Sequence, residues 1–149
     1  MSQDTLKDTK LLDRVAARRA QAIVDRATAA LDGPMAKRAT AVDNLVTKAL
    51  GVIQENGVYA GFLFLFSRTR TKDKTIAEVV REELLHLAAE DLPFGWGLPG
   101  SMASKEALPY VSGTICSDLD PLLMTKEVFE QTLIYARYGA KARKNDGGD

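Results

Sequence analysis

Cations repeat along the first forty residues at a spacing that suits binding to a polyanion. The row consists of Lys7, Lys10, Arg14 and Arg18, and Arg19 and Arg26 flank it. On a helix, at about 100° per residue, the row falls within an arc of roughly 80°. A rigid row of cations can follow a phosphate backbone, where each contact releases condensed counterions. We assign these residues to RNA binding, although the same pattern is typical of a solvated helix face.

Two further basic clusters lie later in the chain. The stretch 68–74 contributes Arg68, Arg70, Lys72 and Lys74. It is predicted to be a polar connector that contacts RNA or serves as an exposed linker. Near the C-terminus stand Arg137, Lys141, Arg143 and Lys144. They are assigned to subunit contact, the alternative being that they stabilise the negative end of a helix dipole.

Side chains for catalysis or metal binding are sparse. The chain has one cysteine, Cys116, and one histidine, His86, which excludes multi-cysteine and histidine-pair metal sites. The glycine-rich run 95–100 lacks the lysine and the strand–turn–helix setting of a phosphate-binding loop. His86 follows Glu82 by four residues, a spacing typical of a surface ion pair. We therefore expect no enzyme activity, no cofactor and no metal.

The net charge of zero conceals an uneven distribution. Twenty Lys and Arg balance twenty Asp and Glu over 149 residues. Residues 75–131 hold three cations and ten anions, whereas residues 132–145 hold four cations and no anion. Basic and acidic surfaces of successive copies could therefore attract one another. The length fits a single domain, residues 1–149.

The elements that position these residues are predicted to be helices. An apolar stripe predicts a long N-terminal helix over about residues 4–32, which Gly33 and Pro34 end. A second helix is expected over 35–56. The apolar run 59–66 favours a helix because the chain offers no partner strand. A further helix is expected over 75–90, with Thr75 as its N-cap.

The segment before the last helix is predicted to be irregular. Residues 92–121 are rich in glycine and proline, which predicts a long loop. Its Phe94 and Trp96 are assigned to contact with a partner subunit. The last helix is expected to end near Lys144 and to be followed by a disordered tail, 145–149. The fold class is thus all-α, a single compact bundle of about five to six helices with this Gly/Pro-rich loop.

The sequence suggests a protein of the cytoplasm without membrane association. The densest apolar stretch, 58–66, is far shorter than the about 20 residues that a membrane-spanning helix needs. Residues 1–10 are polar, and no apolar segment of a secretory signal follows them.

Two segments carry a family resemblance. Leu50–Gly57, followed by the apolar run 58–66, is similar to an Ile-Gln-x-Asn-Gly element that joins two helices before an apolar helix. Thr125–Ala142 is similar to a closing helix with a Lys/Arg-aromatic-Ala-x-Ala ending, here Arg137–Ala142. In these segments, in its long N-terminal helix and in its length, the chain resembles the small α-helical subunit of type III-B CRISPR effector complexes, the Cmr-module small subunit.

The resemblance implies a non-catalytic role in a ribonucleoprotein complex of antiviral defence. Members of this family stack head-to-tail along a filament of backbone subunits and help to form a basic groove for the duplex of crRNA and target RNA. The expected partners are therefore the backbone subunit, further copies of the chain, crRNA and target RNA. The alternatives are a helical protein–protein adaptor that binds no nucleic acid and a small helical enzyme.

Overall fold

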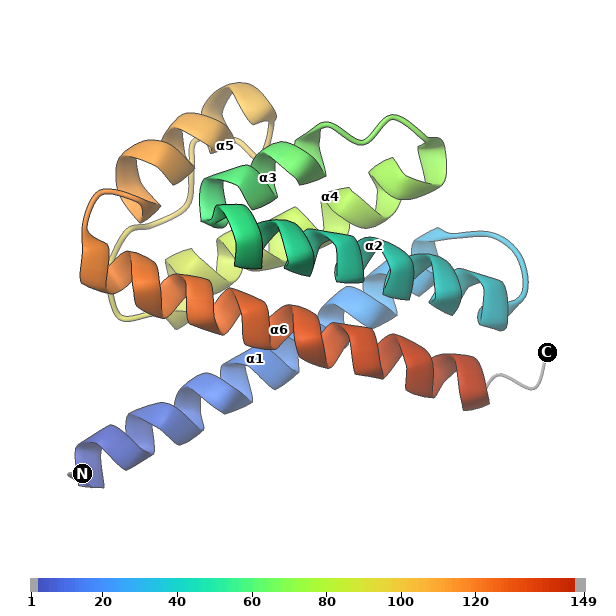
Figure 1. Cartoon of the computed structure of the whole chain (residues 1–149), viewed down its shortest axis with the longest axis horizontal. Helices are drawn as coiled ribbons and strands as arrows, with labels where there is room; N and C mark the ends of the chain where they lie inside the picture. Colours follow the sequence, from blue (N-terminus) through green and yellow to red (C-terminus); the bar gives the residue numbers. More distant parts are fainter. Residues whose placement is uncertain (1–2, 147–149) are drawn as a thin grey trace.

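The computed structural model describes the backbone of residues 3–146 and the side chains of residues 11–146. Within that part the chain is all-α and contains no strand (Figure 1). Its helices are α1 (Gln3–Ala30), α2 (Met35–Asn56), α3 (Val58–Phe66), α4 (Thr71–His86), α5 (Ser104–Tyr110) and α6 (Leu119–Asp146). The π-helical turns η1 (Leu87–Asp91) and η2 (Val111–Ile115) extend α4 and α5. The predicted all-α bundle of five to six helices is confirmed.

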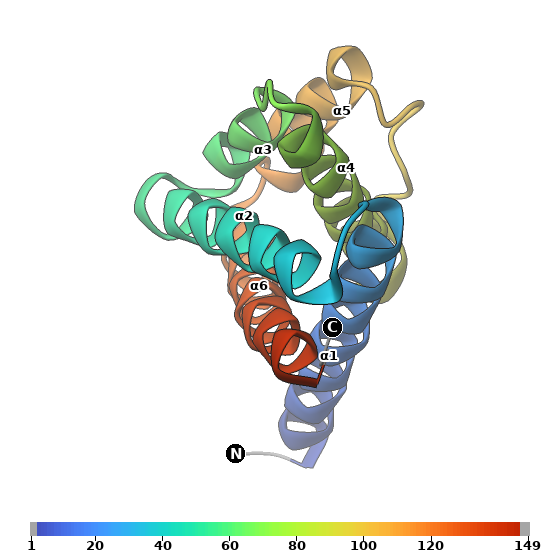
Figure 2. The ribbon, with the colours of Figure 1, turned by 90° about the vertical axis from the view of Figure 1, so that its right-hand side faces the viewer.

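The C-terminal helix α6 is the central element of the bundle. It lies between α1 and α2 and packs along both of them (Figure 2). Helices α3 and α4 pack on each other and on α2, and α4 also packs on α1. The N-terminal part of α1 extends beyond the rest of the bundle, where it diverges from α6 (Figure 1).

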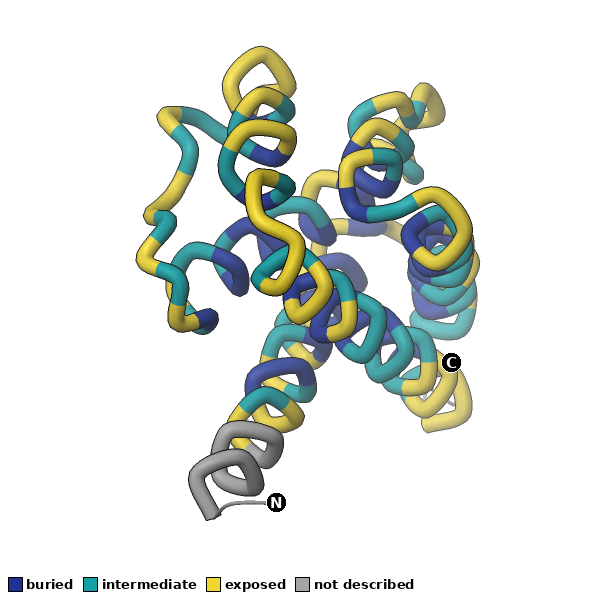
Figure 3. The backbone as a smooth tube through the Cα atoms, turned by 60° about the vertical axis from the view of Figure 1, so that its left-hand side comes forward, coloured by how far each residue is buried: buried dark blue, intermediate teal, exposed yellow. Residues whose placement is uncertain are grey.

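The helix boundaries predicted for α1, α2 and α3 agree closely with the structure. The stripe of α1 is buried at Ala16, Ala20, Ile23 and Ala27. Buried and exposed positions alternate along α1, as expected of a helix with one face against the bundle (Figure 3). Between α2 and α3, Gly57 adopts a φ of 98°. This positive φ favours glycine, so the chain turns there from one helix directly into the next.

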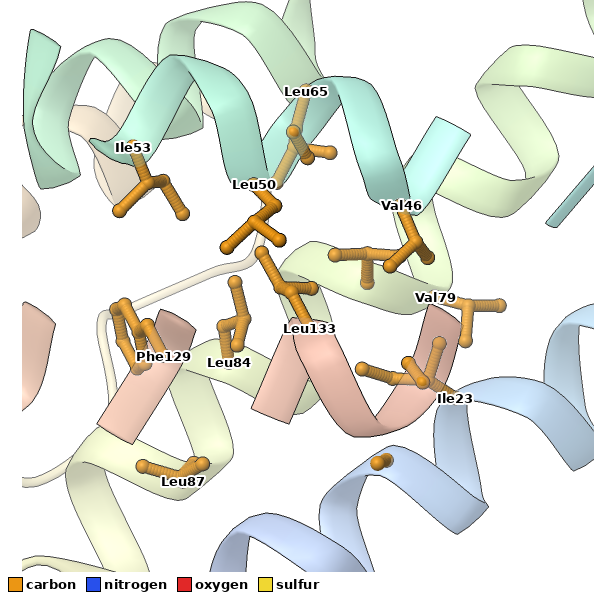
Figure 4. Close-up of a cluster of buried hydrophobic side chains, with 14 of the residues drawn as sticks. Ile23, Val46, Leu50, Ile53, Leu65, Val79, Leu84, Leu87, Phe129 and Leu133 are labelled. Carbon is orange, nitrogen blue, oxygen red and sulfur yellow. The ribbon is translucent and has the colours of Figure 1, made fainter. Parts of the chain in front are cut away.

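The core is centred where α2, α3, α4 and α6 meet. Phe62 and Phe129 pack edge to face with ring centroids 6.0 Å apart, an arrangement that aromatic quadrupoles favour. Leu50, Leu84 and Leu133 lie beside them (Figure 4). All of these side chains except Leu50 are completely buried. Helix α3 thus buries one face in the core, while its Tyr59 and Leu63 are partly exposed.

The start of α4 differs from the prediction. The helix begins at Thr71 rather than Thr75, and Thr75 is not its N-cap, because its hydroxyl donates to the Thr71 carbonyl at 3.0 Å. Asp73 in the first turn pairs with Arg70 at 3.2 Å, and a carboxylate there stabilises the positive end of the helix dipole. The connector therefore ends at residue 70, so Lys72 and Lys74 lie on the helix.

The irregular segment before α6 is shorter than predicted. Only residues 92–103 and 116–118 are irregular. The prediction of a continuous loop over 92–121 is wrong for α5, for η2 and for the first residues of α6. Ala107, Val111 and Ile115 recur every four residues and are fully buried, which explains why this part is helical. The Tyr110 hydroxyl then donates to the Gly97 carbonyl at 2.6 Å and holds the irregular stretch against α5.

The last helix is longer at both ends than the sequence indicated. It begins at Leu119, and Asn145 and Asp146, expected in a disordered tail, are its last residues. The rest of that tail, residues 147–149, lies outside the described residues.

Two glycines in the helices provide a matched test of this packing. A methyl group at Gly51 would meet no atom within 4 Å, whereas one at Gly61 would overlap the side chain of Ile53. We expect Gly51→Ala to raise the free energy of unfolding by about 0.5–1 kcal/mol. Gly61→Ala should lower it by about 1–3 kcal/mol, because α3 must move away from α2. Urea denaturation measures both, and equal effects of the two variants would contradict the packing described.

Candidate nucleic-acid interface

The cationic row of α1 is only partly available to a ligand. Arg14 and Arg18 are exposed, and Arg14 forms no ion pair with a described residue. The Arg18 guanidinium lies 3.3 Å from Asp91 in η1, although its side chain remains 69% exposed. The side chains of Lys7 and Lys10 lie outside the described residues. Two arginines of the row therefore face solvent.

The flanking arginines of α1 are engaged by carboxylates of α4 and η1. Arg19 donates to Glu83 at 3.1 Å and to Asp91 at 2.6 Å. Arg26 donates to Glu83 at 2.6 Å and to Glu82 at 3.3 Å. We call this set of five residues the ionic cluster. The Arg19 side chain is only 16% exposed, and two carboxylates occupy its hydrogen-bond donors. A phosphate could therefore bind Arg19 only by displacing these carboxylates.

The ionic cluster keeps its arginines charged. Burial by itself would lower the pKa of Arg19, but hydrogen bonds to Asp91 and Glu83 outweigh that effect and raise it. The pKa of Arg26 is raised in the same way by Glu83 and Glu82. Glu83 is only 7% exposed, and a buried carboxylate needs such partners because its desolvation is costly. Arg19 and Arg26 thus attach α1 to α4.

A basic groove opens at the other end of the bundle, between α2, the start of α4 and the end of α6. Its volume is about 490 Å³. The cations that line it are Lys37, Lys48, Arg70, Lys72 and Lys144. The one carboxylate in the lining is Asp73, which pairs with Arg70. Parts of the chain that are far apart in sequence therefore combine into a site that attracts anions.

Two of these cations come from α2 and were missed by the sequence analysis. Lys37, Ala41, Asn44 and Lys48 follow one another at helical spacing on the face away from the buried stripe of α2. The small side chain of Ala41 leaves the groove open between the two lysines. Two lysines eleven residues apart resemble any solvated helix face, so only the tertiary arrangement reveals them.

The cations of the stretch 68–74 have separate positions. Arg70 and Lys72 line the basic groove, and Lys74 is exposed on the first turn of α4. Arg68 donates to the Phe64 carbonyl at 3.0 Å and stacks over the Phe64 ring at 4.0 Å. Its guanidinium thereby covers the end of α3.

The four cations near the C-terminus also occupy separate positions. Lys144 lines the basic groove, and Lys141 is exposed. Arg137 lies 3.9 Å from Asp43 of α2, and Arg143 pairs with Asp25 of α1. Both arginines connect α6 to a neighbouring helix, which leaves Lys141 as the cation of this cluster most accessible to another subunit.

The aromatic pair of the irregular segment packs against the chain itself. The rings of Phe94 and Trp96 stack with centroids 4.7 Å apart. Both are half-buried against the hydrophobic core. Only their outer edges are therefore available for the partner contact assigned to them.

The described residues contain neither a cluster of metal-ligating side chains nor a helix that could span a membrane. Over residues 11–146, no three His, Cys, Asp or Glu side chains converge as metal ligands would. His86 pairs with Glu90 of η1, not with Glu82 as expected, because Glu82 faces Arg26. None of the described helices is both long and apolar enough to span a membrane.

Comparison of the chain with protein-family models, curated proteins and solved structures finds no match.

The buried carboxylate of the ionic cluster can be tested directly. We expect Glu83→Gln to lower the free energy of unfolding by about 1–3 kcal/mol, since it leaves two arginines without their shared counter-charge. Glu78→Gln on the exposed face of α4 is the matched control and should change stability by about 0.5 kcal/mol or less. Urea denaturation compares them; a Glu83→Gln protein as stable as the control would show that the cluster adds nothing.

Proposed function

We propose that this chain is a non-catalytic, RNA-contacting small subunit of a type III-B CRISPR ribonucleoprotein complex in the cytoplasm. The observation that supports RNA contact most strongly is the basic groove, where five cations line one depression that contains a single, already paired carboxylate. Four of these cations lie on α2, α4 and α6, and Arg70 directly precedes α4. The CRISPR assignment rests on the resemblance of segments 50–66 and 125–142. The crRNA, the target RNA, the backbone subunit and further copies of the chain are the proposed partners.

The chemistry of the groove favours phosphate over bases. Its cations are ammonium and guanidinium groups, which bind phosphate oxygens by charge-assisted hydrogen bonds. Arg70 and Lys72 stand at the N-terminus of α4, where the helix dipole adds positive potential. No aromatic side chain belongs to the lining, so bases have no surface on which to stack. Contacts of this kind position a nucleic acid without reading its sequence.

The proposed contact with other subunits uses surfaces outside the groove. On α6, Lys141 is exposed beside Tyr138, which is 60% exposed. These two side chains form no ion pair or hydrogen bond with the described residues, so a neighbour can bind them without disturbing the bundle. Arg137, by contrast, is committed to α2.

Charge reversal in the groove tests the proposed RNA contact. We expect Lys37→Glu with Lys48→Glu to weaken binding of a labelled RNA duplex by about tenfold or more at low salt, because two phosphate contacts become repulsive. The slope of log affinity against log salt should fall in magnitude by roughly 2. Fluorescence anisotropy over a salt series measures both quantities.

The control has the same change in net charge at a distance from the groove. Lys105→Glu with Lys126→Glu alters one cation on α5 and one on the first half of α6, and neither lines the groove or is assigned to RNA binding. If the control weakens binding as much as the groove variant does, RNA does not bind preferentially at the groove. Far-ultraviolet circular dichroism confirms that both proteins remain folded.

A further inference from the structure

A second groove lies at the end of the bundle opposite the basic groove. It opens between the N-terminal part of α1 and the first half of α6, with a volume of about 500 Å³. Its lining includes Leu12, Asp13, Leu123, Met124, Glu127 and Tyr135. The proposed RNA contact does not use this surface, which we call the acidic apolar groove.

The apolar side chains of this groove are left uncovered. Leu123 is 53% exposed and Met124 is 38% exposed, and Leu119, one turn earlier on α6, is 68% exposed. Elsewhere α6 buries its apolar face against α1 and α2, but here α1 diverges from it (Figure 1). No other described element fills the opening. Adjacent exposed apolar side chains on a folded protein typically mark a binding surface.

The charges of the groove are all negative. The charged residues in its lining are Asp13 and Glu127. The Tyr135 hydroxyl donates to the Asp13 carboxylate and so holds it at the rim. Asp118 and Asp120 add two exposed carboxylates at the start of α6. The one cation nearby on α6, Lys126, pairs with Glu130 at 3.7 Å. A ligand therefore needs an apolar face with positive charges beside it.

The shape of the groove suits a helix. Two diverging helices leave a wedge in which a third helix can pack against both. The lining of α6 runs from Leu123 to Tyr135, which corresponds to about 18 Å or roughly three turns. We propose that the acidic apolar groove binds an amphipathic helix of another protein. Such a helix carries apolar residues at i, i+3 or i+4 and i+7, with Lys or Arg on both flanks.

A second copy of this chain fits the groove less well. On the described surface, the exposed cations of α6 lie beside Tyr138, and those of α1 lie beside Leu11. Each of these surfaces has one large exposed apolar side chain, whereas a ligand that fills the groove needs several apolar side chains along one face of a helix. Charge and apolar pattern together therefore favour a helix from a different protein.

A pair of synthetic peptides tests the proposal on the full-length chain. The first is a helical peptide of about 18 residues with a leucine stripe flanked by Lys and Arg, and the second replaces these cations with Glu. We expect the basic peptide to bind about fivefold or more tightly than the acidic one. Glu127→Lys should reduce that preference to about twofold or less, because one of the two rim carboxylates changes sign. Fluorescence anisotropy of the labelled peptides measures the affinities.

Leu123→Ser separates the apolar contribution from a general loss of stability. It should weaken binding of the basic peptide by about tenfold, whereas Leu98→Ser, at a residue 45% exposed in the irregular segment, should leave binding unchanged. Equal affinity for the two peptides, or equal effects of the two leucine variants, would overturn the proposal. Analytical ultracentrifugation provides a further test. If the chain self-associates with rising concentration, and Leu123→Ser abolishes this association while Leu98→Ser does not, then a second copy occupies the groove and the proposal is wrong.

Discussion

The attachment of α1 to α4 is centred on the buried carboxylate of Glu83. Glu83 lies almost out of solvent between Arg19 and Arg26, and its desolvation is tolerable only because both guanidinium groups reach it. The two arginines lie seven residues apart, which is two helical turns, so this carboxylate sets both the rotation and the axial position of α1. Once α1 is fixed in this way, its apolar stripe is buried in the core, and Arg14 faces solvent.

The ionic cluster explains why the two arginines that flank the cationic row of α1 do not form a free basic surface. Arg19 and Arg26 neutralise carboxylates of the acidic middle of the chain, and Arg18 contacts Asp91. What remains positive is assembled from α2, the start of α4 and the end of α6. The external potential is the sum over neighbouring charges, so a cation paired with a carboxylate adds little to it, and tertiary packing decides which cations are paired.

The same reasoning shows what the sequence could predict. The long stripes of α1 and α2 and the apolar run of α3 identify their helices because each pattern is local. The helical nature of residues 104–115 was hidden by Pro109 and Gly113, although Ala107, Val111 and Ile115 retain helical spacing. For the candidate site, Arg70 and Lys72 were predicted to bind RNA, whereas Lys144, which lines the same groove, was assigned to subunit contact. Lys37 and Lys48 were not, because nothing within α2 distinguishes them until α4 and α6 pack beside it.

The zero net charge of the chain is therefore a balance between surfaces that are well separated. Met124 of the acidic apolar groove and Lys144 of the basic groove lie on the same helix, twenty residues or about 30 Å apart. That distance is more than three times the Debye length of about 8 Å at physiological ionic strength. An anion in one groove and a basic helix in the other would therefore hardly sense each other's charge. Any coupling between the two grooves would then be mechanical. Among the described helices, α6 is the one that lines both grooves, and it also pairs with α1 through Arg143–Asp25 and with α2 through Arg137–Asp43.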